Sequence, residues 1–214
     1  MIDISKIIVG LGTAHTGRTP GKCAPDKSFR EAVYSREIVP RVREELEKRG
    51  IKTFVDYEPL EPKPEWISKN WRIERNRELE YRVRVVNSYC SKYGKDHVLF
   101  VSMHTDACPG AGWQEARGLS VRVSPLASSK SKRLAKLLYE AGDRRGLRGN
   151  RAVPSGKFWV QSLYVLNETA CPAVLTETLF QNNREDVKFL LSEEGRKAVV
   201  DFHVEGIVNY IKSL

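Results

Sequence analysis

The chain lacks the features of a membrane protein and of a disulfide-stabilised protein. No stretch reaches the roughly 18 uncharged apolar residues that a transmembrane helix needs. The N-terminal segment MIDISKIIVGLGTAHTGR has no basic region before its short apolar run, so we predict no secretory signal. Cysteine is scarce and shows no CxxC spacing, which argues against a zinc ribbon and favours reduced thiols. The four cysteines, whose pairing the sequence leaves open, are Cys23, Cys90, Cys108 and Cys171.

Repeats, low-complexity tracts and Gly/Ser linkers are also absent, and 214 residues suit one domain over 1–214. With 36 Lys+Arg against 27 Asp+Glu, the net charge is +9, which suits an anionic polymer such as nucleic acid, an acidic membrane surface or a cell wall. Many basic residues alternate with Glu, as in RIERNRELEYRVR, which is typical of solvated helix faces. No RNP or zinc-finger pattern occurs, so we predict no nucleic-acid partner.

Buried strands alternate with amphipathic helices along the chain. Strands are predicted at 6–14, 51–57, 97–104 and 119–124, and helices at 28–49, about 72–92, 128–146 and 193–214. Continuous apolar strands separated by helices indicate an α/β fold, with a mostly parallel central sheet and helices on both faces.

Three local features modify this pattern. Pro40 falls inside the first helix and should kink it. The proline-rich, Trp-containing segment 57–71 is predicted to be a loop or insertion. Two short apolar runs, 163–166 and 173–176, are separated by a turn at Cys171-Pro172.

Metal-competent side chains fall at the ends of the predicted strands. His15 follows the first strand, His104 ends VLFVSMH, and Glu177 follows PAVLT. Ligands bind beyond the carboxyl ends of strands in open α/β sheets, and the loop after His15 can bring Glu31 to the same edge. Two imidazoles, one carboxylate and an open fourth position form the ligand set of a catalytic Zn²⁺. Glu177 would remain as a carboxylate outside the metal shell.

Each residue also has a purely structural interpretation. A strand-end histidine is commonly a hydrogen-bonded loop residue, and Glu31 would favour a helix N-terminus by charge alone. Glu177 could pair with Arg184 or Arg148. Two further histidines lack the convergence on this edge and are expected to be structural: His97 and His203.

Several of these residues lie in short motifs that follow one another in order. The motifs are the strand before His15, Glu31 opening a helix that closes at EKRG, RVRVVN with Arg82 and Asn87, FVSMHTDA with His104, and PAVLTETLFQNNRED with Glu177. From about residue 6 to the C-terminus, the chain therefore resembles the zinc-dependent N-acetylmuramoyl-L-alanine amidases of the amidase-3 group, which include phage endolysins and bacterial autolysins.

The resemblance implies a function and a site. It implies that His15, Glu31 and His104 bind Zn²⁺ and that Glu177 is the catalytic residue. A zinc-activated water would cleave the amide between N-acetylmuramic acid and L-alanine in peptidoglycan, with Glu177 accepting its proton. Candidate substrate contacts are Asp106, Trp113 and Asn183.

The chain departs from the family pattern in three places. The family usually has Asp-Pro-Gly-His-Gly-Gly at the first ligand, where this chain has Gly-Thr-Ala-His-Thr-Gly. It has Thr-Asp-Ala instead of Ala-Asn-Ala after the second histidine, which places Asp106 beside the site to contact substrate or to support His104. Segment 57–71 is longer and richer in proline than the usual connection.

Two other classes remain alternatives. One is a carboxypeptidase-like zinc peptidase on a similar sheet, and the other is a basic module that binds an anionic polymer without zinc and without using Glu177. The expected partner is peptidoglycan, with no nucleic acid and no stable membrane insertion. The expected setting is a phage endolysin made in the cytoplasm without a signal peptide and released by a separate holin-type pore. A secreted or periplasmic autolysin whose signal was removed is the alternative.

Overall fold

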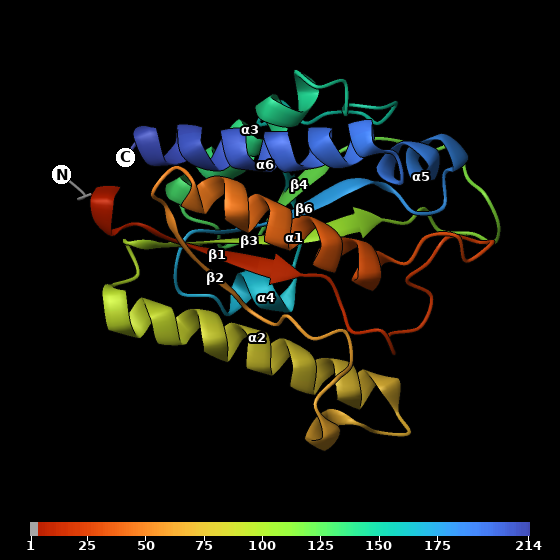
Figure 1. Ribbon diagram of the computed structural model, residues 1–214, viewed down its shortest axis with the longest axis horizontal. Coiled ribbons are helices and arrows are strands. Elements are labelled where there is room, and N and C mark those ends of the chain that lie inside the picture. Colours follow the sequence, from red (N-terminus) through yellow and green to blue (C-terminus); the bar gives the residue numbers. More distant parts are fainter. Residues whose placement is uncertain (1–3) are drawn as a thin grey trace.

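A six-stranded sheet with helices packed on both faces forms the centre of the computed structural model, which describes residues 4–214 (Figure 1). The strand order is β2-β1-β3-β6-β4-β5. The strands are β1 (Ile8–Thr13), β2 (Lys52–Val55), β3 (Val98–Asp106), β4 (Ser120–Val123), β5 (Trp159–Val160) and β6 (Ala173–Phe180). All neighbours pair in parallel except β4 and β6, which are antiparallel. The predicted α/β fold with a mostly parallel sheet is confirmed.

The helices form two layers. They are α1 (Glu31–Glu47), α2 (Trp71–Tyr93), α3 (Ser129–Asp143), α4 (Tyr164–Asn167), α5 (Arg184–Leu190) and α6 (Glu193–Lys212), with 3-10 turns η1 (Ile4–Lys6) and η2 (Pro64–Trp66). Helices α1, α3 and α6 pack together over one face, and α2 and α4 lie over the other (Figure 1). No helix among the described residues is both long enough and apolar enough to span a membrane.

The first helix begins later than the sequence pattern predicts. Ser28 donates its hydroxyl to the Asp26 carboxylate at 2.6 Å and so belongs to a turn. The helix therefore begins at Glu31, which places this carboxylate in its first turn. Helix α1 then continues through Pro40 as a single element, and Gly50 follows its end with φ of 76°.

Two apolar cores hold the layers together. The larger joins the sheet to α1, α3 and α6, and the smaller joins it to α2 and α4. The predicted run 163–166 contributes to the smaller core through α4, and the run 173–176 begins β6. All four cysteines are free, and Cys90 and Cys171 are buried in the smaller core.

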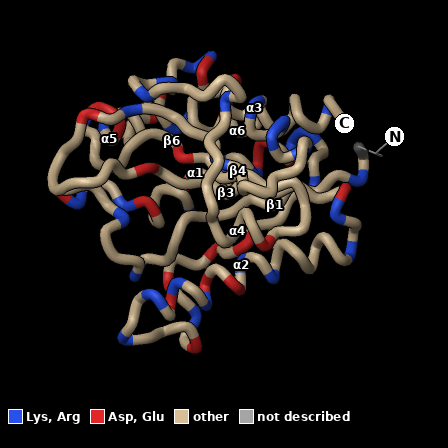
Figure 2. Tube along the Cα trace, turned by 180° about the vertical axis from the view of Figure 1, so that it is seen from behind, with Lys and Arg blue, Asp and Glu red and all other residues tan. Residues whose placement is uncertain are grey.

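Surface charge is mixed rather than gathered by sign. Figure 2 shows Lys and Arg interspersed with Asp and Glu along much of the chain. Helix α1 carries ion pairs one turn apart, including Arg41 with Glu37 at 2.8 Å and Arg43 with Glu47 at 3.0 Å. These pairs fit the interpretation that many basic residues belong to solvated helix faces.

Candidate metal centre and catalytic cavity

Strands β1 and β3 end at the side of the molecule where α2 begins (Figure 1). A cavity of about 460 Å³ lies at this carboxyl edge of the sheet, and its lining includes His15, His104, Asp106 and Glu177. Its size is that of a small-molecule binding site. The edge predicted from the sequence is therefore hollowed and polar.

Three of the predicted residues form a compact cluster. His15, Glu31 and His104 each place one ligand-type atom within 4.8 Å of the other two. Glu31 is 1% exposed, with Oε1 2.9 Å from His104 Nδ1 and Oε2 3.4 Å from His15 Nε2. The two imidazole rings meet edge to face, with centroids 4.9 Å apart. The structure thus brings together all three residues that were expected to bind metal.

The electrostatics of the cluster suit a divalent cation. Burial opposes ionisation of Glu31, but the neighbouring His15 and His104 imidazoles hold its pKa well below its usual range. Burial lowers the pKa of His104 to about 4, so this ring is neutral at pH 7. Oε2 of Glu31 is buried and accepts no hydrogen bond from the described residues. The neutral His104 ring, the His15 imidazole and an ionised carboxylate with an unused oxygen form a donor set that fits Zn²⁺.

The first histidine is held in a strained backbone conformation. His15 has φ of 44°, a left-handed value that is uncommon for a residue other than glycine. Its carbonyl accepts hydrogen bonds from Arg36 Nη2 at 2.7 Å and from Arg82 Nη2 at 3.2 Å. Arg36 also donates to the carbonyls of Ala14 and Pro59, both at 2.8 Å. Sequence reasoning missed Arg36, because nothing in the helical pattern separates it from the other arginines of α1.

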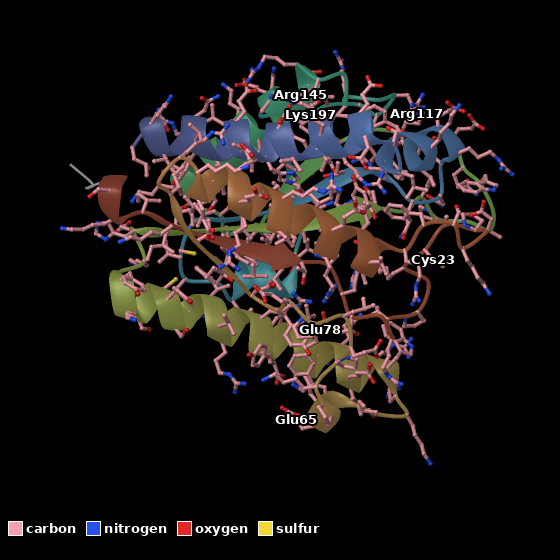
Figure 3. The ribbon with its side chains drawn as sticks, viewed as in Figure 1. Cys23, Glu65, Glu78, Arg117, Arg145 and Lys197 are labelled. Carbon is pink, nitrogen blue, oxygen red and sulfur yellow. The ribbon has the colours of Figure 1, made fainter. Side chains whose placement is uncertain are left out.

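Arg82, one of the motif residues, lies in a buried ion network. Its guanidinium is 3% exposed and contacts Asp56 at 2.8 Å and Glu78 at 2.9 Å. Figure 3 shows Glu78 on α2 near the sheet. The other motif residue, Asn87, donates to the Glu168 carbonyl at 2.9 Å. Arg82 therefore ties α2 to the cavity, and Asn87 ties it to the segment after α4.

Glu177 stands next to the cluster. It lies on β6 in register with His104 on β3. Burial and the nearby Asp106 carboxylate raise the pKa of Glu177 to about 8. Its Oε2 has no hydrogen-bond partner among the described residues, and its Oε1 lies 3.7 Å from Arg122 Nη2. The cation that faces Glu177 is thus Arg122, and neither of the two arginines considered from the sequence forms an ion pair with it in the described part of the chain.

Asp106 anchors two arginines at the cavity wall. Its Oδ2 accepts from Arg122 Nη2 at 2.7 Å and from Arg151 Nη2 at 2.8 Å. Asp106 therefore fixes Arg122 beside Glu177, and among the described residues its carboxylate accepts from the two arginines and from Ala107 N rather than from His104. Both of these arginines were missed from the sequence, since they come from β4 and from a distant loop.

The other two predicted substrate contacts lie outside the cavity lining. Asn183 caps α5, accepting from Asp186 N at 3.0 Å and donating to the Gln114 carbonyl at 2.8 Å. Trp113 packs under the Arg184 guanidinium, 4.6 Å from its ring centroid. The geometry gives no support to substrate contact at these two positions.

The two remaining histidines have structural partners. His203 is fully buried, its Nδ1 donates to the Val199 carbonyl at 2.8 Å, and its Nε2 lies 2.8 Å from Thr176 Oγ1. Burial lowers the pKa of His203 to about 4, so it is a neutral core residue. His97 lies 3.1 Å from the Tyr93 carbonyl through its Nδ1. Neither belongs to the metal-type cluster.

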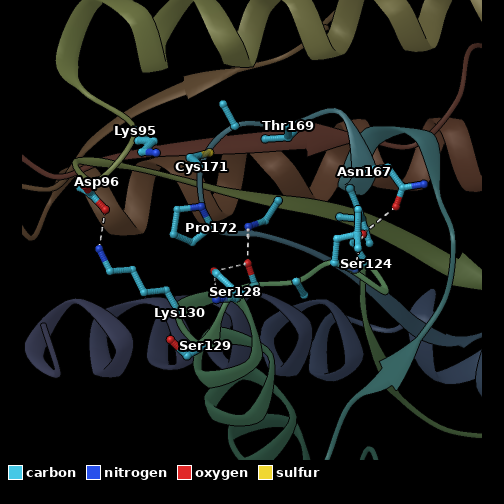
Figure 4. A pocket seen from close by; sticks show the side chains of 16 residues that line it. Lys95, Asp96, Ser124, Ser128, Ser129, Lys130, Asn167, Thr169, Cys171 and Pro172 are labelled. Carbon is cyan, nitrogen blue, oxygen red and sulfur yellow. Dashed lines mark hydrogen bonds and ion pairs between the residues drawn. The ribbon is translucent and has the colours of Figure 1, made fainter.

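A second cavity, of about 380 Å³, lies where β3 and β6 begin (Figure 4). Several of its polar side chains are paired with one another, as in the ion pair of Asp96 with Lys130 and the 2.7 Å hydrogen bond from Ser124 to Asn167. No histidine lines it. Among the described residues, the cluster of His15, Glu31 and His104 thus lies at the carboxyl edge and not at this cavity.

Comparison with known proteins agrees with this geometry. Residues 9–209 match the amidase-3 family model, described as N-acetylmuramoyl-L-alanine amidase. An endolysin of Bacillus phage SPP1 is 32% identical over 116 residues, which make up 53% of this chain and 40% of that protein. The chain thus spans well under two thirds of the length of that curated relative.

Solved structures share the fold. An N-acetylmuramyl-L-alanine amidase from Mycobacterium smegmatis superposes with a TM-score of 0.79 at 21% identity, over 100% of both chains. The CwlD amidase of Clostridioides difficile, solved in complex with the GerS lipoprotein, gives 0.80 at 22% identity, over 97% of this chain and 100% of that one. With its family match over nearly the whole length and its site geometry, the chain belongs to the amidase-3 family of N-acetylmuramoyl-L-alanine amidases.

Proposed function

We propose that this chain is a zinc-dependent hydrolase that cleaves the amide between N-acetylmuramic acid and L-alanine in peptidoglycan. The observation that carries the proposal is the cluster of His15, Glu31 and His104 beside Glu177 at one cavity. Membership of a family that is generally zinc-dependent supports it. The match favours this reaction over that of a carboxypeptidase-like enzyme or of a polymer-binding module.

In this proposal the three clustered side chains hold the cofactor. His15, Glu31 and His104 would bind Zn²⁺, which leaves a coordination position open. When bound, the ion polarises the amide carbonyl and stabilises negative charge on its oxygen. The buried carboxylate of Glu31 supplies the negative charge that a dication needs, and the Arg36 hydrogen bond keeps the His15 loop beside it.

Glu177 moves the proton. In the ionised form of Glu177, the unpartnered Oε2 accepts a proton from the attacking water, whose oxygen forms the new bond to the carbonyl carbon. The same oxygen then gives the proton to the amide nitrogen, so that the C–N bond breaks. The products are a lactyl carboxylate on the sugar and a free amine on L-alanine. Arg122, held by Asp106, orients the carboxylate during both transfers.

The biological context of the reaction is inferred from sequence similarity and net charge. We propose that residues 1–214 act as one catalytic domain in phage-type lysis of the bacterial cell wall. Similarity to the SPP1 endolysin supports this setting, and the charge of +9 favours attraction to an anionic wall. In this proposal, the protein is made in the cytoplasm and is released through a separate pore-forming protein.

Product analysis tests the proposed reaction. The zinc-loaded protein is incubated with purified peptidoglycan, and the soluble products are identified by mass spectrometry. We expect stem peptides that begin with a free L-alanine amine and glycan strands that end in a lactyl carboxylate, with about one zinc per chain. Cleavage within the stem peptide would instead identify a peptidase and overturn the proposal.

A further inference from the structure

One face of α2 continues the wall of the cavity outward. Arg75, Leu79 and Arg82 line the cavity, and Trp71 precedes Arg75 by one helical turn on the same face. Trp71 is 39% exposed, and its ring lies 5.2 Å from the Arg75 guanidinium. An aromatic side chain therefore stands at the rim of the cavity beside Arg75, which lines the cavity, and the Arg72 guanidinium also lies 5.1 Å from its ring.

Two polar atoms on this wall are buried and have no partner among the described residues. One is the donor Arg75 Nε, and the other is the acceptor Glu78 Oε2. Both residues line the same cavity, and Glu78 is only 2% exposed. A buried group without a partner costs about 1–3 kcal/mol, which a ligand that supplies the hydrogen bond removes. The wall thus suits a ligand with an apolar face and both donor and acceptor groups.

Segment 57–71 packs against α2 and so supports the position of Trp71. Trp66 packs between Tyr57 and Tyr81, with ring centroids 4.8 and 5.1 Å away. The carbonyls of Glu65 and Trp66 accept hydrogen bonds from Arg77 on α2. The proline-rich insertion is therefore a small aromatic core that fixes the start of α2 and the position of Trp71.

The strand order places this wall on the side opposite the proton donor. Helix α2 lies near β1 and β2 at this edge, since Glu74 in its first turn contacts Arg18 in the loop after β1, and Arg82 contacts Asp56 just beyond β2. Glu177 lies on β6 and Arg122 on β4, on the other side of β3. In the proposed reaction Glu177 protonates the departing amine, so the peptide half of the substrate lies on the β6 side of the scissile bond. The sugar half then extends toward α2.

We propose that Trp71, Arg75 and Glu78 form a subsite for a pyranose ring of the glycan strand. This inference rests on the proposed function for the identity of the substrate. The indole ring packs against the C–H face of the sugar, because both surfaces are flat and apolar. Arg75 donates to an acetamido carbonyl, and Glu78 Oε2 accepts from a hydroxyl or amide N–H group of the sugar.

Binding measurements on an inactive protein test the subsite. In the zinc-loaded Glu177→Gln protein, the titrated ligand is a peptide-free oligosaccharide of alternating N-acetylglucosamine and N-acetylmuramic acid. We expect Trp71→Ala to weaken binding about tenfold and Trp71→Phe to restore most of it. The matched control is Tyr93→Ala, because Tyr93 is 40% exposed on the same helix, about 33 Å away along its axis. This control should bind the oligosaccharide like the parent.

Three results would overturn the proposal. They are failure of the parent to bind the oligosaccharide, equal binding by Trp71→Ala, and a loss in Trp71→Ala that affects free stem peptide and spares the glycan. Hydrolysis by the wild-type chain is measured separately through release of the L-alanine amine. If that release fails while glycan binding still depends on Trp71, the proposed reaction is wrong and the subsite stands.

Discussion

The two edges of the sheet differ in how their polar groups are satisfied. At the carboxyl edge, a carboxylate oxygen in each of Glu31, Glu78 and Glu177 is buried and has no hydrogen-bond partner among residues 4–214. At the opposite edge, within the same described range, no residue that lines the second cavity has a buried side-chain polar atom without a partner. Both cavities are similar in size, at about 460 and 380 Å³.

This difference in hydrogen-bond satisfaction is more informative about function than cavity volume is. Native proteins leave few buried polar groups unsatisfied, so a cluster of them at one edge indicates a site completed by a ligand. The paired groups at the other edge need none. Substitutions at the carboxyl edge should therefore change zinc binding or hydrolysis, whereas substitutions at the opposite edge should not. A result against either expectation would contradict this difference between the edges.

The largest effect is expected from His104. Replacing one of two imidazole ligands should abolish stoichiometric zinc binding, so His104→Ala should lose metal and hydrolysis together. His97→Ala is the matched control, because His97 lies in the turn immediately before β3 and outside the cluster, and it should keep about one zinc per chain. Metal analysis of the purified proteins decides, and full occupancy in His104→Ala would refute the ligand assignment.

The next largest effect is expected from Glu177. Glu177→Gln keeps the shape of the side chain but removes the proton acceptor, so hydrolysis should fall roughly 10²–10⁴-fold. Zinc content and melting temperature should stay close to wild type, because the carboxylate lies outside the cluster. A structural ion pair with Arg122 predicts the reverse, namely lower stability with turnover largely kept. Measuring all three quantities on this one variant separates the two roles.

A smaller effect is expected from Arg36, which acts on metal through the His15 loop. A lysine at position 36 keeps the charge but cannot reach the carbonyls of Ala14, His15 and Pro59 together. Arg36→Lys should weaken zinc affinity by about 10–100-fold, the usual weight of a residue that orients a ligand. The control is Arg43→Lys, since Arg43 lies on the same helix and pairs only with exposed carboxylates. Competition with a zinc chelator measures both, and equal affinities would show that His15 does not need Arg36.

The sequence predicted the sheet and the metal-type cluster because both depend on local pattern. Apolar strands end at His15 and His104, and parallel strands must bring their ends to one edge. The helix that carries Glu31 was also predicted, although it begins at Glu31 and not at Ser28. These features need no knowledge of distant contacts.

The walls of the site depend on distant contacts, and the sequence could not predict them. Arg122 and Arg151 meet at Asp106 only because β4 turns antiparallel to β6 and a distant loop folds back. The register between β3 and β6 shifts just beyond His104, where Leu179 has a left-handed φ of 64°. Trp71 fell in segment 57–71, which was predicted to be a loop or insertion. Its proposed role depends on which face of α2 lines the cavity, and the sequence does not show this.

The smallest effect is expected at the opposite edge, from the ion pair of Asp96 with Lys130. Both side chains are exposed, 57% and 37%, and such pairs contribute about 0–1 kcal/mol because solvent screens them. Asp96→Asn should therefore lower the melting temperature by at most about 2–4 °C and leave zinc content and peptidoglycan hydrolysis unchanged. The measurement is informative because this cavity rivals the catalytic one in volume. A loss of hydrolysis in a stable, zinc-loaded Asp96→Asn protein would show that the opposite edge also takes part in function, and the contrast between the two edges would fail.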